Sequence, residues 1–329
     1  MNNYSMDKLF FILMRKLYSK VLGTYQLPLL KREMIPNQAS DIIYNQLTSN
    51  DPCMISRFGA VEISAVTNYL GTISTKHKVW NYITGKDPEW WWNEGVKRVM
   101  TDNAGFFPST EENLNKFSRL MLDDIKLLDV LGSWQNDEMR FIDKFPSASI
   151  LYFVLLDPYW STTPWTRALK GKKVLVVHAF AEEIEYQYRV NRTKIFTNQD
   201  ILPLFELKTL KAVQSIGGTD KFNTWFDALQ HMKDEIDKID YDICLIGCGA
   251  YGLPLAAHVK RKGKKAVHIG GTLQLLFGIK GKRWENPEYA RSYFGESGKY
   301  LQLINDHWIR PGSSSQIEGA KKVEDSCYW

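Results

Sequence analysis

The chain has 329 residues, of which 24% are charged and 44% are hydrophobic, as in an ordinary globular protein. Its net charge of +5 suits an acidic ligand or an anionic membrane surface, but no dense Lys/Arg block of the nucleic-acid kind is present. These values disfavour nucleic acid as a partner. The four cysteines form no Cys-x-x-Cys pair, which disfavours zinc-finger and disulfide frameworks and indicates a reducing compartment such as the cytoplasm.

The first element expected along the chain is a basic amphipathic helix over residues 4–22, with a Leu/Phe/Ile/Met face flanked by lysines and arginine. Two interpretations stand side by side: a peripheral anchor at the inner face of a membrane, or a first helix packed on the core. The apolar run inside it is too short to span a bilayer, and no signal-peptide cleavage site follows it. We expect residues 1–48 to form a helical extension of a single domain at 49–329.

The next elements are a helix over 39–47, a short strand over 53–56, and a helix that opens at the Arg-Phe-Gly segment and ends near Leu70. Residues 86–150 read as mainly helical, with turns at 87–88, 107–109 and 132–133. In the second half, apolar and β-branched residues predict a strand over 174–177. Further elements expected there are a helix containing Gln187, a strand end at 213–215, and a helix over 221–239.

A glycine-rich βαβ pattern then follows. A buried strand at 243–246 leads into the Gly-x-Gly-x-x-Gly loop of Gly247, Gly249 and Gly252, a helix, and a second strand that ends before Gly270 and Gly271. Such a loop lets a backbone approach a phosphate or sugar at a helix N-terminus. The acidic residue that holds ribose hydroxyls in dinucleotide sites is missing after the second strand, which disfavours NAD, FAD and S-adenosylmethionine. A tight turn that binds nothing remains the other interpretation.

Strands that alternate with helices predict an α/β, Rossmann-like fold, with a mostly parallel sheet covered by helices on both faces. Ligands of such sheets bind at the carboxyl ends of the strands. The chemistry-bearing residues at the predicted strand ends are Ser56, Arg57, His178, Gln214, Gly247, His268 and Gly270. We therefore expect them to share one cleft.

With these residues assembled, the sequence resembles the GT-D glycosyltransferase family of bacteria. The matching segments are Ser-Arg-Phe-Gly-x-x-Glu at 56–62, the 173–180 strand, the 246–252 loop, the block at 268–284, and the closing Cys-Tyr-Trp. The resemblance implies a Rossmann-like enzyme that moves a hexose from a nucleotide sugar, typically a UDP-sugar, onto a growing surface glycan, glycoprotein glycan or lipid-linked glycan.

The catalytic candidates are Arg57, Glu62 and His178. Arg57 can clamp a phosphate or pair with Glu62. Glu62 can act as general base toward the acceptor hydroxyl, bind a donor hydroxyl, or be a structural carboxylate. His178 is a candidate for the cleft or a satisfied core histidine. The expected donor-binding residues are Gly59, Gly247, Gly249, Tyr251, Gly252, His268, Gly270, Gly271, Gln274, Lys280 and Arg283.

Several of these have two interpretations. Tyr251 can stack on uracil or plug the end of the sheet, and Gln274 can hydrogen-bond sugar or ribose hydroxyls. The basic residues Lys280 to Arg283 can neutralise a diphosphate or form a solvated turn. Trp284 and Trp308 read as core or lid packing, while Asp157, Gln187 and Gln214 are secondary candidates.

The resemblance includes one departure. The family loop reads Arg-Phe-Gly-Asp-Gly-Glu, a paired-carboxylate motif tied to donor and metal binding, whereas this chain has Ala60 and Val61 before Glu62. Mn²⁺ or Mg²⁺ held between carboxylates and donor phosphates needs acidic oxygen ligands, and Glu62 is the only candidate. Metal dependence is therefore open, and positive side chains are the alternative means of stabilising the leaving diphosphate.

Overall fold

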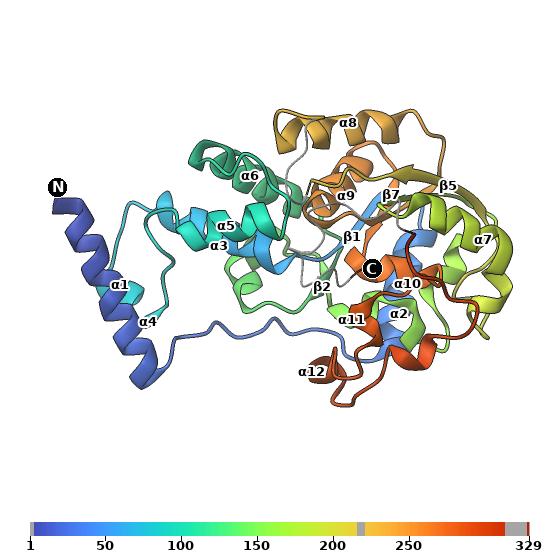
Figure 1. Cartoon of the computed structure of the whole chain (residues 1–329), viewed down its shortest axis with the longest axis horizontal. Helices are drawn as coiled ribbons and strands as arrows, with labels where there is room; N and C mark the ends of the chain where they lie inside the picture. The colour runs from blue at the N-terminus through green and yellow to red at the C-terminus, as the bar shows by residue number, and fades with distance from the viewer. Residues whose placement is uncertain (1–2, 216–220, 313–327, 329) are drawn as a thin grey trace.

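Seven parallel strands form one sheet at the centre of the molecule (Figure 1). The computed structural model describes residues 3–215, 221–312 and 328. The sheet order is β3-β2-β1-β7-β6-β4-β5. The strands are β1 (Cys53–Ser56), β2 (Val130–Ser133), β3 (Ser149–Tyr152), β4 (Lys173–His178), β5 (Glu206–Lys211), β6 (Ile243–Gly247) and β7 (Lys265–His268).

The order of the strands creates a switch point near the middle of the sheet. From β1 the chain builds outward through β2 to β3, whereas from β4 it builds outward in the other direction to β5. Strands β6 and β7 then fill the space between β4 and β1. Ligands of open α/β sheets bind at the carboxyl ends of strands beside such a point. This edge is where β1, β7, β6 and β4 end.

The strands alternate their side chains between two hydrophobic cores, one on each face. Ile55, Val174 and Val267 belong to one core, and their neighbours Met54, Leu175 and Ala266 belong to the other. The first core is completed by α2 (Pro36–Thr48), α7 (Ala181–Ile195) and α10 (Leu273–Leu276). The second is completed by α3 (Ala60–Thr72), α5 (Glu94–Asp102), α6 (Glu111–Asp124), α8 (Trp225–Asp237) and α9 (Gly252–Arg261). The predicted α/β class, with helices on both faces, is confirmed.

Two strands lie where the sequence pattern predicted mainly helix. Residues 86–150 contain β2 and β3, and the predicted turn at Gly132 and Ser133 is the end of β2. Both strands have only four residues, and β2 ends in Gly-Ser, a pair typical of turns. All four residues of β2 are buried between two neighbouring strands, so tertiary packing decides its conformation. The strand end that the sequence predicted at 213–215 also differs from the structure, in which β5 ends at Lys211.

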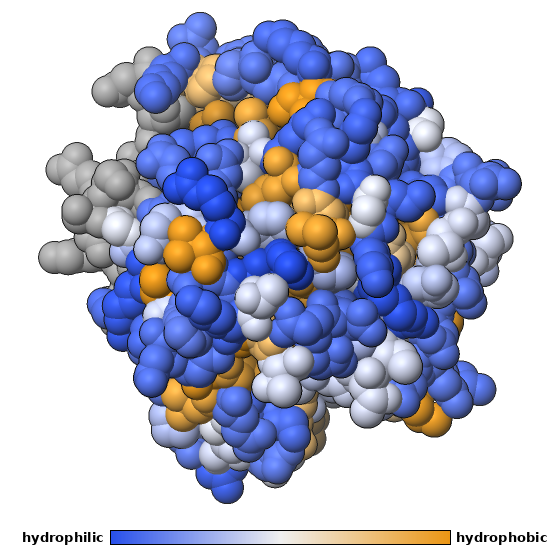
Figure 2. All heavy atoms as spheres, turned by 90° about the vertical axis from the view of Figure 1, so that its right-hand side faces the viewer, coloured by the Kyte–Doolittle hydropathy of each residue, from blue (hydrophilic) through white to orange (hydrophobic). Residues whose placement is uncertain are grey.

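The N-terminal region is helical, as predicted. Helix α1 (Asn3–Leu22) lies at one end of the long axis of the molecule, beside α4 (Val79–Thr84) (Figure 1). The short helices α11 (Lys282–Glu285) and α12 (Arg291–Phe294) follow α10. At the opposite end of the long axis, the surface is largely hydrophilic, with hydrophobic side chains in small separate groups (Figure 2). No helix among the described residues is long and apolar enough to cross a membrane.

Candidate functional site

Two adjoining cavities open at the carboxyl ends of the central strands. The first, of about 170 Å³, lies at the ends of β4 and β6, and the second, of about 290 Å³, lies at the ends of β1 and β7. They share the walls formed by Asn103, Gly249, Ala250, Gly271 and Tyr328. We treat them as one cleft with two compartments, called the β4/β6 cavity and the β1/β7 cavity.

Most of the sequence-based candidates line this cleft. In the β4/β6 cavity these are His178, Gln214, Gly247, Gly249, Tyr251, Gly271 and Gln274. In the β1/β7 cavity they are Arg57, Gly59, Glu62, Gly249, His268, Gly270, Gly271, Arg283 and Trp284. The ends of the strands meet because the sheet is parallel and in register, with His178 opposite Gly247 and His268 opposite Ile246.

The glycine loop carries the chain from β6 over the edge of the sheet into α9. Gly249 has a φ of +58°, a conformation that disfavours residues with a Cβ atom. Gly252 opens α9 directly against His268, where a Cβ would lie 2.2 Å from Nε2 of the imidazole. Only glycine permits this approach. The loop therefore brings the turn at Gly249 and Ala250, which lines both cavities, and the start of α9 to the edge of the cleft.

His268 is a buried, neutral residue at the end of β7. Its Nδ1 lies 3.0 Å from the hydroxyl oxygen of Ser56, which ends β1. Burial, and then the nearby charge of Arg57, lower the pKa of His268 to about 3. The imidazole thus stays uncharged at physiological pH and ties together the ends of two neighbouring strands.

Arg57 presents a guanidinium to the β1/β7 cavity without a carboxylate partner. Its Cζ lies 5.1 Å from the ring centres of both Trp134 and Phe153, which hold the side chain by cation–π contacts. Trp134 is itself fixed, because its indole N–H donates to the carbonyl oxygen of Phe58 at 3.0 Å. No ion pair of the described residues includes Arg57, so the alternative of a direct pair with Glu62 is not realised.

Glu62 lies in the first turn of α3 and lines the same cavity. Its carboxylate folds back toward Gly59, where a Cβ would lie 1.9 Å from Oε2. The side chain is half-buried, and this burial raises the pKa of Glu62, opposed by a backbone hydrogen bond and by the charge of Arg57. A carboxylate with a raised pKa in a cleft suits proton transfer near neutral pH.

Arg283 provides a second guanidinium in the β1/β7 cavity. It donates from Nη1 to the hydroxyl of Tyr328 at 2.8 Å, and its Cζ lies 4.5 Å from the centre of that ring. Tyr328 also accepts a hydrogen bond from Gln274 Nε2 at its backbone oxygen, 3.2 Å away. The penultimate residue of the chain thereby forms part of the wall between the two cavities.

Asn103 and Tyr328 line both cavities but were not among the site residues expected from the sequence. Asn103 is the C-cap residue that follows α5, and nothing in its local sequence distinguishes it from a surface asparagine. For Tyr328, the only sequence signal was the closing Cys-Tyr-Trp of the family resemblance.

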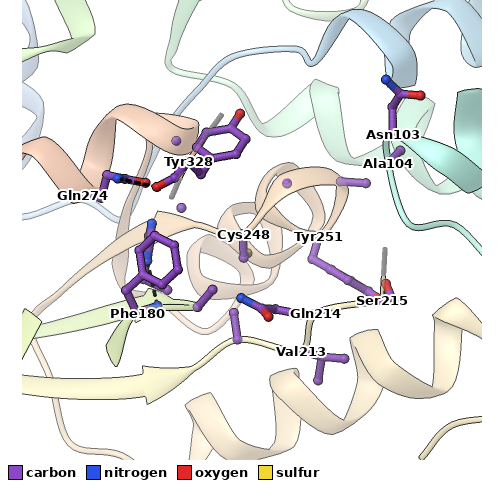
Figure 3. Close-up of a pocket in the computed structure, with 17 residues that line it drawn as sticks. Asn103, Ala104, Phe180, Val213, Gln214, Ser215, Cys248, Tyr251, Gln274 and Tyr328 are labelled. Carbon is purple, nitrogen blue, oxygen red and sulfur yellow. Dashed lines mark hydrogen bonds between the residues drawn. The ribbon is translucent and has the colours of Figure 1, made fainter. Parts of the chain in front are cut away.

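The β4/β6 cavity is mostly apolar and contains a few directed polar groups. In Figure 3, Phe180 and Tyr328 lie at one end, and Asn103, Tyr251 and Ser215 at the other. His178 Nδ1 accepts the backbone N–H of Phe180 at 3.0 Å, which leaves the proton of the neutral ring on Nε2. Burial lowers the pKa of His178 to about 3, so the ring is a neutral hydrogen-bonding group.

Gln274 is fully buried at the border of this cavity. Its Nε2 donates to the backbone oxygens of Ile279 and Tyr328, each at 3.2 Å. Its carbonyl oxygen accepts no hydrogen bond from a described residue. A buried acceptor without a donor is costly, and a ligand N–H or O–H is one way to satisfy it.

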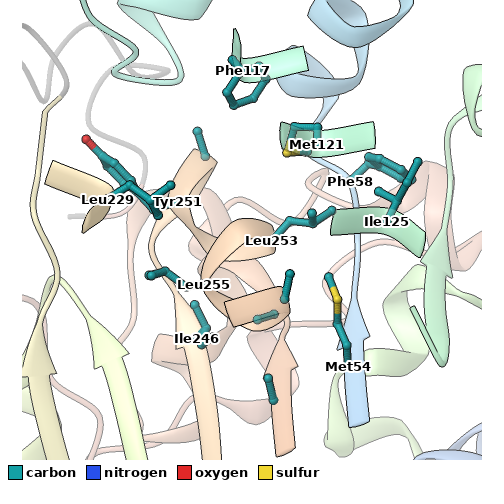
Figure 4. Packing of buried hydrophobic residues seen from close by; sticks show 14 of the residues in the cluster. Met54, Phe58, Phe117, Met121, Ile125, Leu229, Ile246, Tyr251, Leu253 and Leu255 are labelled. Atoms are coloured by element: carbon teal, nitrogen blue, oxygen red, sulfur yellow. The ribbon is translucent and has the colours of Figure 1, made fainter. Parts of the chain in front are cut away.

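Other candidates make contacts with side chains of the protein itself. Tyr251 touches the β4/β6 cavity, but its ring stacks on Trp225 at 4.8 Å, its hydroxyl lies 2.8 Å from that of Ser215, and it packs among the buried side chains in Figure 4. This matches the alternative that it plugs the sheet end. Lys280 lies 3.6 Å from Glu285 and is not among the residues lining either cavity. Lys282 is exposed.

Some of the secondary candidates are held in the core, and others border a cavity. Gln187 is buried and donates to the backbone oxygens of Gly278 and His307, and Trp308 packs in the first core. Asp157 borders a small side cavity next to Arg57 and accepts a hydrogen bond from the Tyr300 hydroxyl at 2.7 Å. Trp284 is almost fully buried although its ring touches the β1/β7 cavity.

The described part of the chain contains no cluster of three or more His, Cys, Asp or Glu side chains that would hold a metal ion. Of the described residues lining the β1/β7 cavity, Glu62 is the single carboxylate. The described cysteines, Cys53, Cys244 and Cys248, are unpaired thiols, and burial raises the pKa of Cys53 to about 12. Cys327 lies outside the described residues.

Comparisons with protein-family models, with curated proteins and with solved structures give no significant match. The class of protein that the fold defines is therefore an α/β protein with a cleft at the switch point of a parallel sheet. Its function has to be argued from the chemistry of that cleft.

Proposed function

We propose that the cleft binds a nucleotide sugar, with a UDP-hexose as the expected donor, and that the protein transfers the hexose to a hydroxyl of a growing glycan. The observation that carries the proposal is Arg57, held between two aromatic rings and paired with none of the described carboxylates, in a cavity that Arg283 also lines. Guanidinium groups recognise phosphate oxygens bidentately. The glycine turn at Gly249, which lines both cavities, lets the backbone approach the same anion closely.

The β4/β6 cavity is the compartment we assign to the nucleobase. Its apolar walls and the rings of Phe180 and Tyr328 suit a flat heterocycle. The unsatisfied carbonyl oxygen of Gln274 can accept the imide N–H of uracil. With the base there, the shared wall at Gly249 and Gly271 leads the diphosphate into the β1/β7 cavity toward Arg57 and Arg283.

The transfer step then takes place beside Glu62. An oxygen–carbon bond forms between the acceptor hydroxyl and the anomeric carbon, and the bond from that carbon to the diphosphate oxygen breaks. Glu62, in its ionised form, takes the proton of the acceptor hydroxyl. Arg57 and Arg283 stabilise the negative charge that builds on the departing diphosphate, which is commonly the largest catalytic contribution.

A divalent cation would find few protein ligands in this arrangement. Mg²⁺ and Mn²⁺ at such sites bind one or two carboxylates together with the donor phosphates. Among the described residues of the β1/β7 cavity, Glu62 alone offers a carboxylate. We therefore expect the two arginines to provide much of the charge neutralisation, and metal dependence is one readout of the experiment below.

The test is a donor screen with the full-length protein against UDP-, GDP-, dTDP- and CMP-sugars, with Mn²⁺ or with EDTA. Thermal stabilisation and nucleotide release are measured together, for the wild type and for Arg57→Met. Stabilisation or hydrolysis with one sugar nucleotide, weakened in the variant, would support the proposal. No response to any sugar nucleotide, with stabilisation by NAD or S-adenosylmethionine, would overturn it.

A second candidate is a nucleotide-sugar-binding module without catalysis. The replacement of the family's aspartate by Ala60 favours it, because only Glu62 remains of the paired carboxylates. This alternative requires saturable donor binding that Glu62→Gln leaves intact, and no transfer to any acceptor. Hydrolysis that depends on Glu62 would exclude it.

A further inference from the structure

Helix α1 is attached to the rest of the molecule by one face only. Its Phe11 ring lies 5.8 Å from Trp90, and Tyr18 lies 5.7 Å from Trp80. Two cations of the same face lie over aromatic rings, Lys8 over Trp91 at 5.3 Å and Arg15 over Tyr82 at 4.8 Å. The contacts are therefore aromatic and cation–π contacts, and none of the residues from Lys8 to Leu22 is buried.

The opposite face of α1 is apolar and exposed to solvent. Leu9, Leu13, Leu17 and Val21 recur every four residues and are 65%, 54%, 51% and 80% exposed, with Phe10 beside them at 57%. An amphipathic helix of a globular protein normally turns its apolar stripe toward the core. Here the stripe points away from it. From Lys8 to Leu22, no residue of α1 belongs to either hydrophobic core, so this part of the helix does not pack on the core.

The exposed face also carries positive charge. Lys16 and Lys20 are exposed on the same side as Leu13, Leu17 and Val21. The sequence from Lys8 to Leu22 contains four basic residues and no acidic one. The adjacent segment before α4 adds exposed Lys76 and Lys78, and Trp80 is 65% exposed.

We propose that α1 is an interfacial helix that binds the surface of an anionic lipid bilayer, with Leu9, Leu13, Leu17 and Val21 inserted among the acyl chains. An interfacial helix needs a large apolar face, cationic flanks and aromatic residues at headgroup level. Here the leucine stripe, Lys16 with Lys20, and the exposed ring of Phe10 meet these three needs. This inference does not rest on the proposed function of the cleft.

A second copy of the chain is a poorer occupant for this surface. In a helix pair, residues beside the apolar stripe of one helix face those of its partner. Lys16 and Lys20 flank the stripe with no acidic residue between Lys8 and Leu22 to pair with them, so two copies would bring like charges together. An anionic bilayer offers the complementary charge.

The experiment is co-sedimentation of the full-length protein with two kinds of vesicle. One is phosphatidylcholine alone, and the other contains phosphatidylglycerol at about one lipid in three, an anionic fraction that attracts basic helices. The test variant is Leu13→Glu with Leu17→Glu. The matched control is Leu204→Glu, since Leu204 is an equally exposed leucine (63%) in the loop before β5. Thermal unfolding of each variant checks that the fold is kept.

We expect the wild type and Leu204→Glu to sediment with the anionic vesicles and much less with neutral ones. The double Leu→Glu variant should lose more than about a hundredfold in partitioning, because two leucine side chains no longer enter the apolar phase. Removing Lys16 or Lys20 should cost about fivefold each at low salt. Equal binding of wild type and double variant, or no binding to either vesicle, would overturn the proposal. So would concentration-dependent dimerisation that the double variant abolishes.

Discussion

Replacing Arg57 by methionine removes the guanidinium from the β1/β7 cavity and leaves a side chain of similar length between Trp134 and Phe153. Because no described carboxylate pairs with Arg57, the substitution deprives no described carboxylate of its cation. A charge-assisted hydrogen bond contributes about 1.5–3 kcal/mol net, and each 1.4 kcal/mol is about tenfold in affinity. We therefore expect Arg57→Met to weaken the binding of UDP by about ten- to a hundredfold.

The assay is isothermal titration of UDP and of uridine into wild type and variant. Uridine has the base and ribose but no phosphate, so its affinity should be unchanged by Arg57→Met. Arg57→Lys should lie between the two, because lysine keeps the charge but lacks the planar fork. The control is Arg167→Met, since Arg167 also stacks on a ring, that of Tyr44 at 3.9 Å, but lies outside the cleft; unlike Arg57, it also pairs with Asp41 at 2.7 Å. Equal losses for UDP and uridine, or none for UDP, would refute the assignment of Arg57 to the diphosphate.

Three further outcomes follow from the same geometry. Glu62→Gln should keep donor binding but lower hexose transfer by about a hundredfold or more and remove the acid limb of its pH profile. Glu112→Gln, at an exposed position of α6, should change neither binding nor transfer. Tyr328→Ala should weaken UDP binding about tenfold by opening the wall between the cavities, and Tyr328→Phe by less, because the ring remains. Burial raises the pKa of Asp157 from 3.8 to about 6, so the folded state binds this proton more tightly than the unfolded state does. The stability that the bound proton contributes is fully present below the unfolded pKa and is lost as pH rises through about 6. Urea unfolding should therefore show a loss of up to about 3 kcal/mol between about pH 4 and pH 7 that Asp157→Asn lacks; an identical pH slope in both proteins would contradict this.

The centre of the sheet could be predicted from the sequence because its strands are continuous apolar runs. In β4 and β6 the apolar and β-branched residues extend over most of the strand, and glycine or histidine marks the end. Since parallel strands end at one edge, the same pattern brought Arg57, His178 and His268 toward a common cleft. Strands β2 and β3 could not be predicted in this way, because four residues carry no recognisable period.

The orientation of individual side chains could not be read from the sequence. Tyr251 lies within the glycine loop, yet its ring stacks on Trp225, a residue of the preceding helix. Lys280 and Arg283 are neighbours in a basic segment, but only Arg283 reaches the cavity, because Lys280 lies toward Glu285. Such differences depend on contacts between segments far apart in the chain. The periodicity and composition of one segment do not show which distant residues its side chains will contact.

The electrostatic character of the cleft follows from which of its groups are able to titrate. His178 and His268 are both buried, and with pKa values of about 3 they remain neutral above moderately acidic pH. Among the described residues, the positive charge that faces a ligand comes from the guanidinium groups of Arg57 and Arg283. Burial raises the pKa values of Glu62, Glu138 and Asp157, and the nearby charge of Arg57 opposes the shift in each. A change in the charge of the cleft well above pH 3 would thus come from a carboxylate rather than from the imidazole of His178 or His268.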